Sequence, residues 1–288
     1  MPRSAPRPIR DRSLLSSRLI ELSESFTLAS ISPDPLEVVR DQSHPLDQEI
    51  VGLIAAAFAY GRADIVVRNV RGIVEAMTPS PQRYVEHFRR ERARRTFATF
   101  SHRFHKVDDL LALLEAIAGA VEKAGSLGAL FRSVHDPDDD DIGPTLSRFT
   151  DRLIDLVPSA PRSLRYLLSS PENGSACKRM NLYLRWMVRR ESPDLGLWPF
   201  ADPSQLVMPL DTHVHRITGF LGLNDRKSAD WKAAVALTRE MRTIDRADPV
   251  RFDFAICRLG ILDLCSRRRD PAQCRICLLR DVCTIRLD

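Results

Sequence analysis

The chain has 288 residues, a formal net charge of +5, 44% hydrophobic residues and 28% charged residues. This length accommodates one large domain or two interlocked domains with a sizeable core, and the composition is that of an ordinary globular protein. No apolar run approaches membrane-spanning length, and the N-terminus has no apolar segment followed by a small-residue cleavage site, so we expect a cytoplasmic protein without a membrane partner.

Apolar residues recur at helical spacing along most of the chain, and no stretch alternates as a half-buried strand does. The sequence therefore predicts an all-α protein, preceded by a basic, disordered arm over residues 1–13. A helix–turn–helix hairpin is expected over residues 170–189. The other helices are expected over residues 14–28, 47–60, 63–77, 84–95, 107–124, 127–131, 145–157, 162–168, 231–241 and 250–264.

Positive charge is concentrated in two segments. Residues 83–106 hold eight basic residues against two acidic ones, and residues 162–190 hold seven against one. Charge of this density suits a polyanion such as DNA, whose affinity for proteins depends on phosphate neutralisation. The alternative is a solvated, arginine-rich helix surface.

The segment Met208–Gly222 carries a candidate catalytic carboxylate. Pro209 interrupts the backbone, and Asp211 can cap a helix whose apolar face follows at Val214 and Ile217. The positive end of the helix dipole favours the ionised form of a carboxylate at this place. The alternative is an ordinary N-cap without chemistry.

The C-terminal cysteines form a second notable pattern. Four of the six cysteines follow the spacing C-x8-C-x2-C-x5-C, which is close enough to bind one soft metal centre. This clustering indicates a reducing compartment, not a disulfide framework. The other two, Cys177 and Cys257, are expected to be buried small residues. The four are Cys265, Cys274, Cys277 and Cys283.

Together these two segments resemble the endonuclease III-like helix-hairpin-helix DNA glycosylases. That superfamily reads V-D-T-H-x-x-R-x-x-x-R-L-G around its catalytic aspartate, and its iron–sulfur branch ends with C-x6-C-x2-C-x5-C. Here Leu210–Arg216 matches the first pattern, with Phe220-Leu221-Gly222 in place of R-L-G, and the first cysteine gap is eight residues. The firm resemblance covers roughly the last eighty residues and indicates a bacterial subfamily.

The resemblance implies a DNA-repair glycosylase that flips a damaged base out of double-stranded DNA, with or without AP lyase activity. Asp211 would stabilise the positive charge that develops at C1′ of the sugar. The four C-terminal cysteines would hold a [4Fe–4S] cluster, with structural zinc as the alternative. Such a cluster would orient nearby arginines toward the DNA backbone, namely Arg267, Arg268, Arg269 and Arg275.

The superfamily's hairpin reads L-P-G-x-G-x-K, and its lysine attacks C1′ of the flipped nucleotide. Lys178 is the matching candidate, although it comes two positions late and Glu172 replaces the first glycine. Backbone N–H groups at Gly174 and Ser175 would bind a phosphate, and Arg179 would support them. The alternative for Lys178 is a lysine that contacts phosphate or is merely exposed.

Further DNA contacts are expected from Arg62, in a segment that related enzymes insert into the duplex, and from His213 and Arg216. Trp198 and Phe200 are candidates for a wall on which the flipped base stacks. The alternative for Trp198, which lies in a proline-rich loop, is packing in the core.

The expected architecture is two interlocked helical domains. Residues 45–205 would form a helical barrel that contains the hairpin at about 165–190. Residues 206–288 would form the cluster domain, joined by the arm and first helix over residues 1–44. We expect a monomer associated with the nucleoid.

Two other functions remain open at this stage. One is a DNA- or RNA-binding protein that keeps the scaffold without the chemistry. The other is a metal-dependent hydrolase that uses His213 and His215. Helical positions i and i+2 point about 200° apart, which disfavours one metal shared by both rings.

Overall fold

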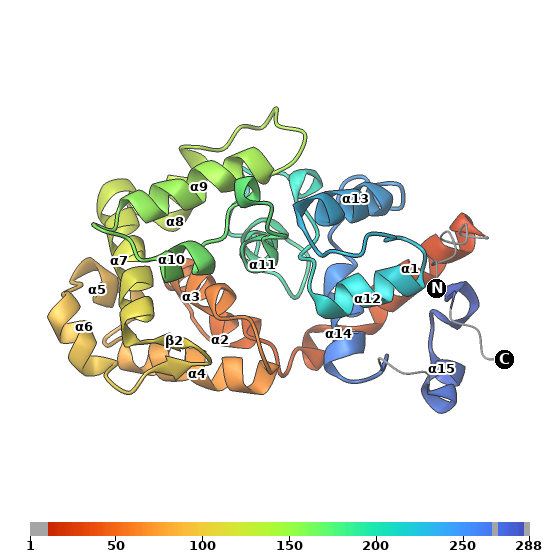
Figure 1. Cartoon of the computed structure of the whole chain (residues 1–288), viewed down its shortest axis with the longest axis horizontal. Helices are drawn as coiled ribbons and strands as arrows, with labels where there is room; N and C mark the ends of the chain where they lie inside the picture. Colours follow the sequence, from red (N-terminus) through yellow and green to blue (C-terminus); the bar gives the residue numbers. More distant parts are fainter. Residues whose placement is uncertain (1–10, 267–269, 285–288) are drawn as a thin grey trace.

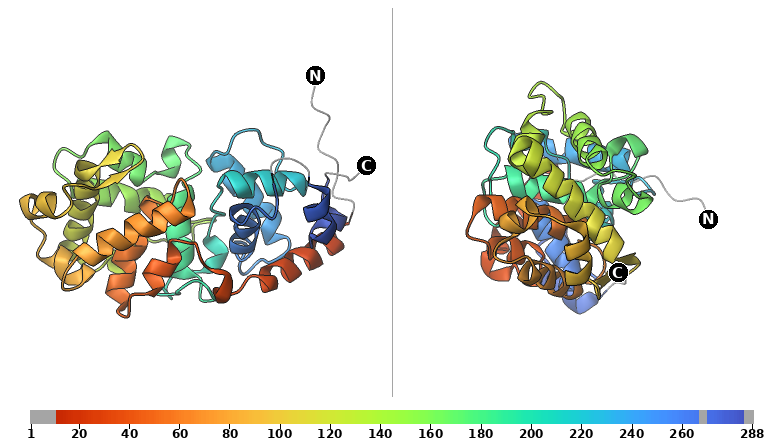
Figure 2. Two further views of the ribbon diagram at one scale, coloured as in Figure 1. Left: turned by 90° about the horizontal axis from the view of Figure 1, so that it is seen from below. Right: turned by 90° about the vertical axis from the view of Figure 1, so that its left-hand side faces the viewer.

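The computed structural model describes residues 11–266 and 270–284, and these are predominantly helical, as predicted. The elongated molecule has two halves: helices α2 to α11 form the larger, and α1 with α12 to α15 forms the smaller (Figures 1 and 2). Most of the expected N-terminal arm, together with Arg267, Arg268 and Arg269, lies outside the described residues. No described helix is both long and apolar enough to cross a membrane.

The first helix packs against the last part of the chain. Helix α1 (Arg12–Ser25) begins inside the segment expected to be a disordered arm, because the Asp11 carboxylate caps it by accepting from Leu14 N at 2.9 Å. Its buried leucines face α14 (Asp253–Ile261), so α1 belongs to the smaller half (Figure 2). These leucines are Leu15, Leu19 and Leu22.

Helix α3 (Pro45–Ala57) lies at the centre of the larger half, where every residue from 49 to 57 is buried. It packs against α11 (Lys178–Val188). A Cβ atom at Gly52 would lie 3.0 Å from Met187 Cε and 3.2 Å from Tyr183, so glycine at this position permits the close approach. The absence of a side chain at Gly52 therefore allows α11 to pack closely against α3.

The other elements of the larger half surround α3 and α11. The α-helices are α2 (Leu36–Arg40), α4 (Ala63–Ala76), α5 (Pro81–Glu86), α6 (Arg90–Thr96), α7 (Val107–Ala124), α8 (Leu127–Arg132), α9 (Gly143–Asp155) and α10 (Arg162–Leu167). Three single turns of 3₁₀-helix connect other segments: η1 (Leu28–Ser30), η2 (Pro171–Asn173) and η3 (Pro203–Gln205).

The helix expected over residues 84–95 is split into α5 and α6. The break allows Tyr84 and Phe97 to pack edge to face, with ring centroids 6.0 Å apart. A straight helix, which rises about 1.5 Å per residue, would hold these rings roughly 20 Å apart. Burial of two aromatic rings therefore outweighs helix continuity.

The structure contains a short β-hairpin that the sequence does not predict. Strands β1 (Ser101–His102) and β2 (His105–Lys106) pair antiparallel, and Arg103 in the turn has a positive φ of 53°. Strands of two residues are too short to produce an alternating pattern. The hairpin lies in the first basic segment, where Arg94 pairs with Asp108 of α7.

The smaller half contains α12 (Thr212–Phe220), α13 (Trp231–Arg242), α15 (Pro271–Ile276) and the turn η4 (Arg280–Val282). Helix α12 packs on α14. At its end, the Phe220 carbonyl oxygen accepts hydrogen bonds from both N and Oγ1 of Thr284, each at 2.7 Å. The cysteine-bearing segment is therefore fastened to α12.

Candidate active site

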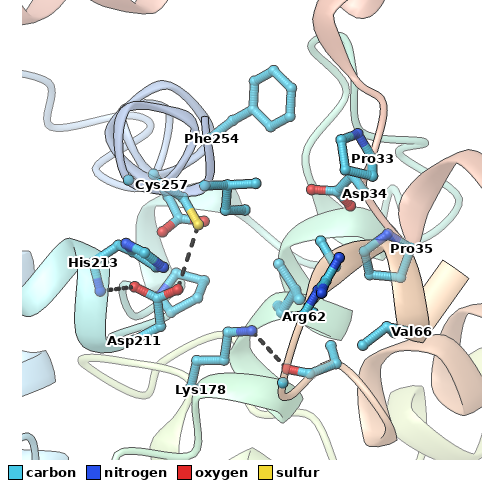
Figure 3. Close-up of a pocket in the computed structure, with 18 of the residues that line it drawn as sticks. Pro33, Asp34, Pro35, Arg62, Val66, Lys178, Asp211, His213, Phe254 and Cys257 are labelled. Atoms are coloured by element: carbon cyan, nitrogen blue, oxygen red, sulfur yellow. Dashed lines mark hydrogen bonds between the residues drawn. The ribbon is translucent and has the colours of Figure 1, made fainter. Parts of the chain in front are cut away.

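A cavity of about 680 Å³ lies where the two halves meet, within the range typical of ligand sites. Its lining includes the loop Pro33–Pro35, the turn after α3, residues of α11, the start of α12, and α14. In Figure 3, Asp34 lies on one wall and Asp211 on the other, with Lys178 below them. The cavity therefore collects side chains from segments far apart in the sequence.

Asp211 is held at two points. It is the N-cap of α12, and its Oδ1 accepts hydrogen bonds from His213 N at 2.8 Å and Val214 N at 2.7 Å. Its Oδ2 accepts from the Cys257 thiol at 3.4 Å. Burial raises the pKa of Cys257 well above its usual value, and the neighbouring Asp211 raises it further. The thiol therefore stays protonated and serves as a donor.

Lys178 begins α11, after Cys177 in a left-handed conformation with φ 48°. Its Nζ donates to the Ala59 carbonyl oxygen at 2.9 Å, just beyond the end of α3. Lys178 makes no ion pair with any residue that the structure describes. The structure brings Lys178 and Asp211 to one cavity, although the two come from different halves of the fold.

Asp253 is a further carboxylate of the cavity, and the sequence analysis did not single it out. It is 3% exposed and pairs with Arg185 of α11. Burial raises the pKa of Asp253 to about 6, although the Arg185 charge opposes this. The pair joins α14 to α11 across the junction of the two halves.

Asp34 lines the opposite wall, also unanticipated. Burial raises the pKa of its carboxyl group, while a hydrogen bond from Leu36 N at 2.9 Å lowers it. Its loop is fixed by Arg258 of α14, which donates to Pro33 O at 2.9 Å and Ser32 O at 2.6 Å. The Arg258 side chain is almost fully buried.

The second basic segment is less available to DNA than its sequence suggests. Arg185 is buried with Asp194 at 3.1 Å, and Arg189 is buried between Asp194 and Asp248. Burial lowers the pKa of Arg185, but the carboxylates of Asp194 and Asp253 raise it by more. These arginines are therefore charged, and their donors are paired with carboxylates inside the protein.

Arg179, expected to contact DNA, is also placed in the interior, with 9% exposure. It donates to the Ala57 carbonyl oxygen at 2.9 Å and to the Tyr166 carbonyl oxygen. Its guanidinium also lies 4.4 Å from the centroid of the Tyr166 ring. Arg179 closes the end of α3 instead of facing solvent, because its donors are used by main-chain acceptors there.

The predicted hairpin turn is exposed at Gly174 and Ser175. Gly174 has a φ of 71°, a conformation that glycine adopts without strain. Its carbonyl oxygen accepts from Trp231 N at 3.1 Å, which fixes the hairpin to the start of α13.

Arg62 lies at the rim of the cavity, with its side chain 80% exposed and paired with Asp64. His213 also lines the cavity, and its ring packs directly against Gly260. His215 instead directs its Nε2 to the Arg226 carbonyl oxygen at 3.0 Å. The two histidines therefore have separate surroundings.

Trp198 does not reach the cavity. It is 1% exposed, its Nε1 donates to Glu49 at 2.9 Å, and its ring stacks on Phe131 at 4.9 Å. Phe200 packs beside it, with ring centroids 6.1 Å apart. The structure thus places Trp198 in the core, as the alternative anticipated, because its large ring fills the space beside α3 and α8. Neither ring forms the expected wall for a base.

Cys265 lies close enough to the other three cysteines of the run for their charges to affect its pKa. Burial raises the pKa of Cys265, Arg216 lowers it, and the three other thiols raise it. Among the described residues, no three His, Cys, Asp or Glu side chains are arranged to hold a metal ion. Arg216, expected to contact DNA, instead donates from Nη2 to the Cys265 carbonyl oxygen at 2.8 Å.

An aromatic patch formed by Tyr60, Phe104 and Tyr166 lies beside the cavity. Phe104 is 60% exposed and Tyr166 48%, and their ring centroids are 5.4 Å apart. Phe104 also stacks on Tyr60 at 5.7 Å, and Tyr60 precedes the cavity-lining Gly61. No sequence motif indicates this patch. Its one signal was the position of Phe104 in the first basic segment.

Residues 34–262 match the family described as "Protein of unknown function (DUF2400)", so the chain belongs to this family. The matched region begins at Asp34 and includes Lys178, Asp211, Asp253 and Cys257. The cysteine run follows it. No curated protein and no solved structure matches the chain.

Proposed function

We propose that the protein is a DNA-repair glycosylase, with AP lyase activity if Lys178 reaches C1′ of the flipped nucleotide. The observation that carries this proposal is that Lys178 and Asp211 line the same cavity. An enzyme that acts on a flipped base needs a pocket of nucleotide size with its reactive groups inside.

In this proposal Asp211 stabilises the transition state as an anion. Two backbone N–H groups and the Cys257 thiol fix its carboxylate before substrate arrives. As the C1′–N bond lengthens, positive charge develops on the sugar, and a preoriented carboxylate stabilises that charge without reorganisation.

Lys178 supplies the nucleophile. Its amine contacts a neutral carbonyl oxygen, so no ion pair has to break before it turns toward C1′. The nitrogen lone pair forms the new bond to C1′ while the glycosidic bond breaks and its electron pair leaves with the base. The attached nitrogen loses one proton to solvent, and the ring oxygen O4′ then leaves C1′ and takes up a proton from solvent, which gives a Schiff base. Loss of a C2′ proton from this Schiff base expels the 3′ phosphate and cleaves the strand.

The surface around the cavity supports DNA as the substrate. The rim offers Arg62, and Arg103 lies against the neighbouring Gly61. The aromatic patch adjoins this rim, and aromatic rings of this kind stack on unpaired bases. The exposed turn at Gly174 and Ser175 offers backbone groups to a phosphate.

A [4Fe–4S] cluster held by Cys265, Cys274, Cys277 and Cys283 belongs to the proposal, with zinc as the alternative. The donor set fits, because four thiols are the ligands such a cluster takes. Arg216 also fits: its buried Nη1 has no hydrogen-bond partner among the described residues, and it lies beside Cys265. A cluster sulfur would supply an acceptor. When bound, the cluster would hold the C-terminal segment on α12.

Borohydride trapping on duplexes that contain an abasic site tests the chemistry. We expect the wild type to be trapped covalently, Lys178→Ala not to be trapped, and Lys123→Ala, which changes an exposed lysine of α7, to behave as wild type. Trapping of Lys178→Ala at the wild-type level would show that another amine is the nucleophile.

Base release from lesion-containing duplexes tests Asp211 separately. We expect Asp211→Asn to lose at least about a hundredfold in rate, the order typical of a lost electrostatic catalyst. Asparagine is also a good N-cap, so α12 should persist. Asp11→Asn, at the N-cap of α1, is the matched control.

The contact of Lys178 with Ala59 favours a second candidate, a DNA- or RNA-binding protein without catalysis. In such a protein, Lys178 would only hold α11 against the end of α3 through this hydrogen bond. This reading predicts salt-sensitive binding, no release of any base, and binding that Asp211→Asn leaves unchanged.

A further inference from the structure

We propose that the cavity selects a cationic base of the N-alkylated purine class, and that Asp34 recognises its positive charge. This inference rests on the proposed glycosylase function and adds its substrate class.

The position of Asp34 is built into the fold. Arg258 is 1% exposed, and its guanidinium donates hydrogen bonds to the carbonyl oxygens of Ser32 and Pro33. It thereby orients the loop that presents Asp34 to the cavity. Leu36 N fixes one carboxylate oxygen, Oδ1, at 2.9 Å. A buried arginine used in this way holds a carboxylate in place without forming an ion pair with it.

The interior of the cavity carries more negative than positive charge. Its inner wall presents the carboxylates of Asp34, Asp211 and Asp253 against the cations Lys178 and Arg185. Arg185 is shared with Asp194, which lies behind it at 3.1 Å. Within the described ranges, neither Asp34 nor Asp211 makes an ion pair. Arg185, Lys178 and Arg258 act on the Asp34 carboxylate without pairing with it. A bound cation would therefore supply the direct partner that this carboxylate lacks among the described residues.

Apolar side chains flank this charge. Pro33 and Pro35 stand on either side of Asp34, and Phe254 lines the same cavity (Figure 3). Flat apolar surfaces accept the faces of a purine ring, while Asp34 accepts from its edge. Figure 3 places Asp34 across the cavity from Asp211, so one ligand can contact both.

A cationic purine also suits the chemistry of the cavity. Alkylation of a ring nitrogen places positive charge on the base, which then departs as a neutral molecule without taking a proton. The cavity needs no acid for such a substrate. A neutral base lacks the positive charge that would attract the Asp34 carboxylate, and where it presents carbonyl oxygens beside its N–H donors, as a uracil-type ring does, the carboxylate would repel those oxygens.

The experiment measures base release by the full-length protein from duplexes that each hold one lesion: 7-methylguanine as the cationic probe, and dihydrouracil or 8-oxoguanine as neutral probes. We expect release of 7-methylguanine to be at least about tenfold faster than release of either neutral base, the size of a charge-assisted hydrogen bond. Release of neutral bases with none of 7-methylguanine would overturn the inference while the glycosylase function stands. If no base is released and nothing is trapped by borohydride, both fail.

The variant Asp34→Asn removes the charge and keeps the shape. We expect it to lose about tenfold on 7-methylguanine and to release the neutral bases no more slowly than the wild type, because the repulsion of their carbonyl oxygens is removed. Asp151→Asn, at an exposed position on α9, is the control. Equal loss on all lesions would assign Asp34 a purely structural role and overturn its part in the inference. Thermal unfolding verifies that each variant is folded; should Asp34→Asn not fold, the wild-type comparison of lesions still decides the substrate class.

Discussion

Arg216 joins α12 to the cysteine run: its Nη2 donates to the carbonyl oxygen of Cys265 at 2.8 Å. The same helix is capped by Asp211 at its start and ends at Phe220, whose carbonyl oxygen accepts hydrogen bonds from Thr284. One nine-residue helix therefore connects the cavity with the segment that contains the four thiols. Its position depends on contacts at both ends.

The first prediction concerns metal retention. Arg216→Gln should lower bound iron or zinc at least about threefold, because a neutral side chain stabilises thiolates less than a guanidinium does. Elemental analysis and visible absorbance of the purified proteins measure this. Arg239→Gln, at an exposed position on α13, should retain the wild-type content. Equal metal content in both variants would remove Arg216 from the site.

The second prediction is a pH dependence of stability. The pKa of Asp253 is about 6 in the folded protein against an ordinary 3.8, so the folded state binds more protons between these values. The contribution of Asp253 to stability is therefore greatest below about pH 4 and falls as the pH rises through about 6. Denaturation of the wild type and Asp253→Asn from pH 4 to 7 should show the wild type losing up to about 3 kcal/mol relative to the variant. A constant difference would contradict this.

The third prediction separates stability from activity at Trp198. Trp198→Phe keeps an aromatic ring but removes the donor to Glu49, whose pKa is raised by burial and lowered by this hydrogen bond. We expect a loss of about 1 to 3 kcal/mol in the free energy of unfolding, as for a buried acceptor left unsatisfied. Rates of base release should not change. If Trp198→Phe is as stable as the wild type but releases bases more slowly, Trp198 takes part in base recognition after all.

The fourth prediction concerns the aromatic patch. Phe104→Ala should weaken binding to DNA with a flipped or abasic nucleotide by about 1 to 3 kcal/mol, the value of one stacked base. Stability should change little, because the ring is 60% exposed. Ile20→Ala, which shortens an exposed residue of α1, provides the control for a lost apolar contact. Equal DNA affinities for both variants would exclude stacking on Phe104.

Helical periodicity predicted most of the helices. An apolar stripe shows which face of a helix is buried, even when the element that packs against that face is not known. Val107–Ala124 was predicted to the residue for this reason. Tertiary contacts decided the rest: the meeting of Tyr84 and Phe97 split one expected helix, and the two-residue strands left no pattern. Such contacts join distant residues, which local patterns cannot describe.

The candidate site could also be predicted only in part, because it too depends on contacts between distant residues. Motif spacing selected Lys178 and Asp211, and the structure brings both to one cavity. Asp34 and Asp253 carry no motif, since only the packing of α14 against the rest places them there. Arg179 shows the reverse case: a residue in a basic segment looks exposed in sequence, yet main-chain acceptors draw it inside.

The last prediction tests how α12 is seated on α14. A Cβ atom at Gly260 would lie 2.1 Å from Nδ1 of His213, so Gly260→Ala must displace the histidine ring and with it the helix start at Asp211. We expect a loss of about 1 to 3 kcal/mol in unfolding free energy, the usual cost of overpacking, and slower base release. Gly72→Ala in α4, where nothing lies within 4 Å, should be neutral or stabilising by up to about 1 kcal/mol.

Adding His213→Ala to Gly260→Ala should restore much of the stability, since the two residues are in contact and their effects are not additive. Additive losses in this double-mutant cycle would show that the His213 ring does not pack on Gly260.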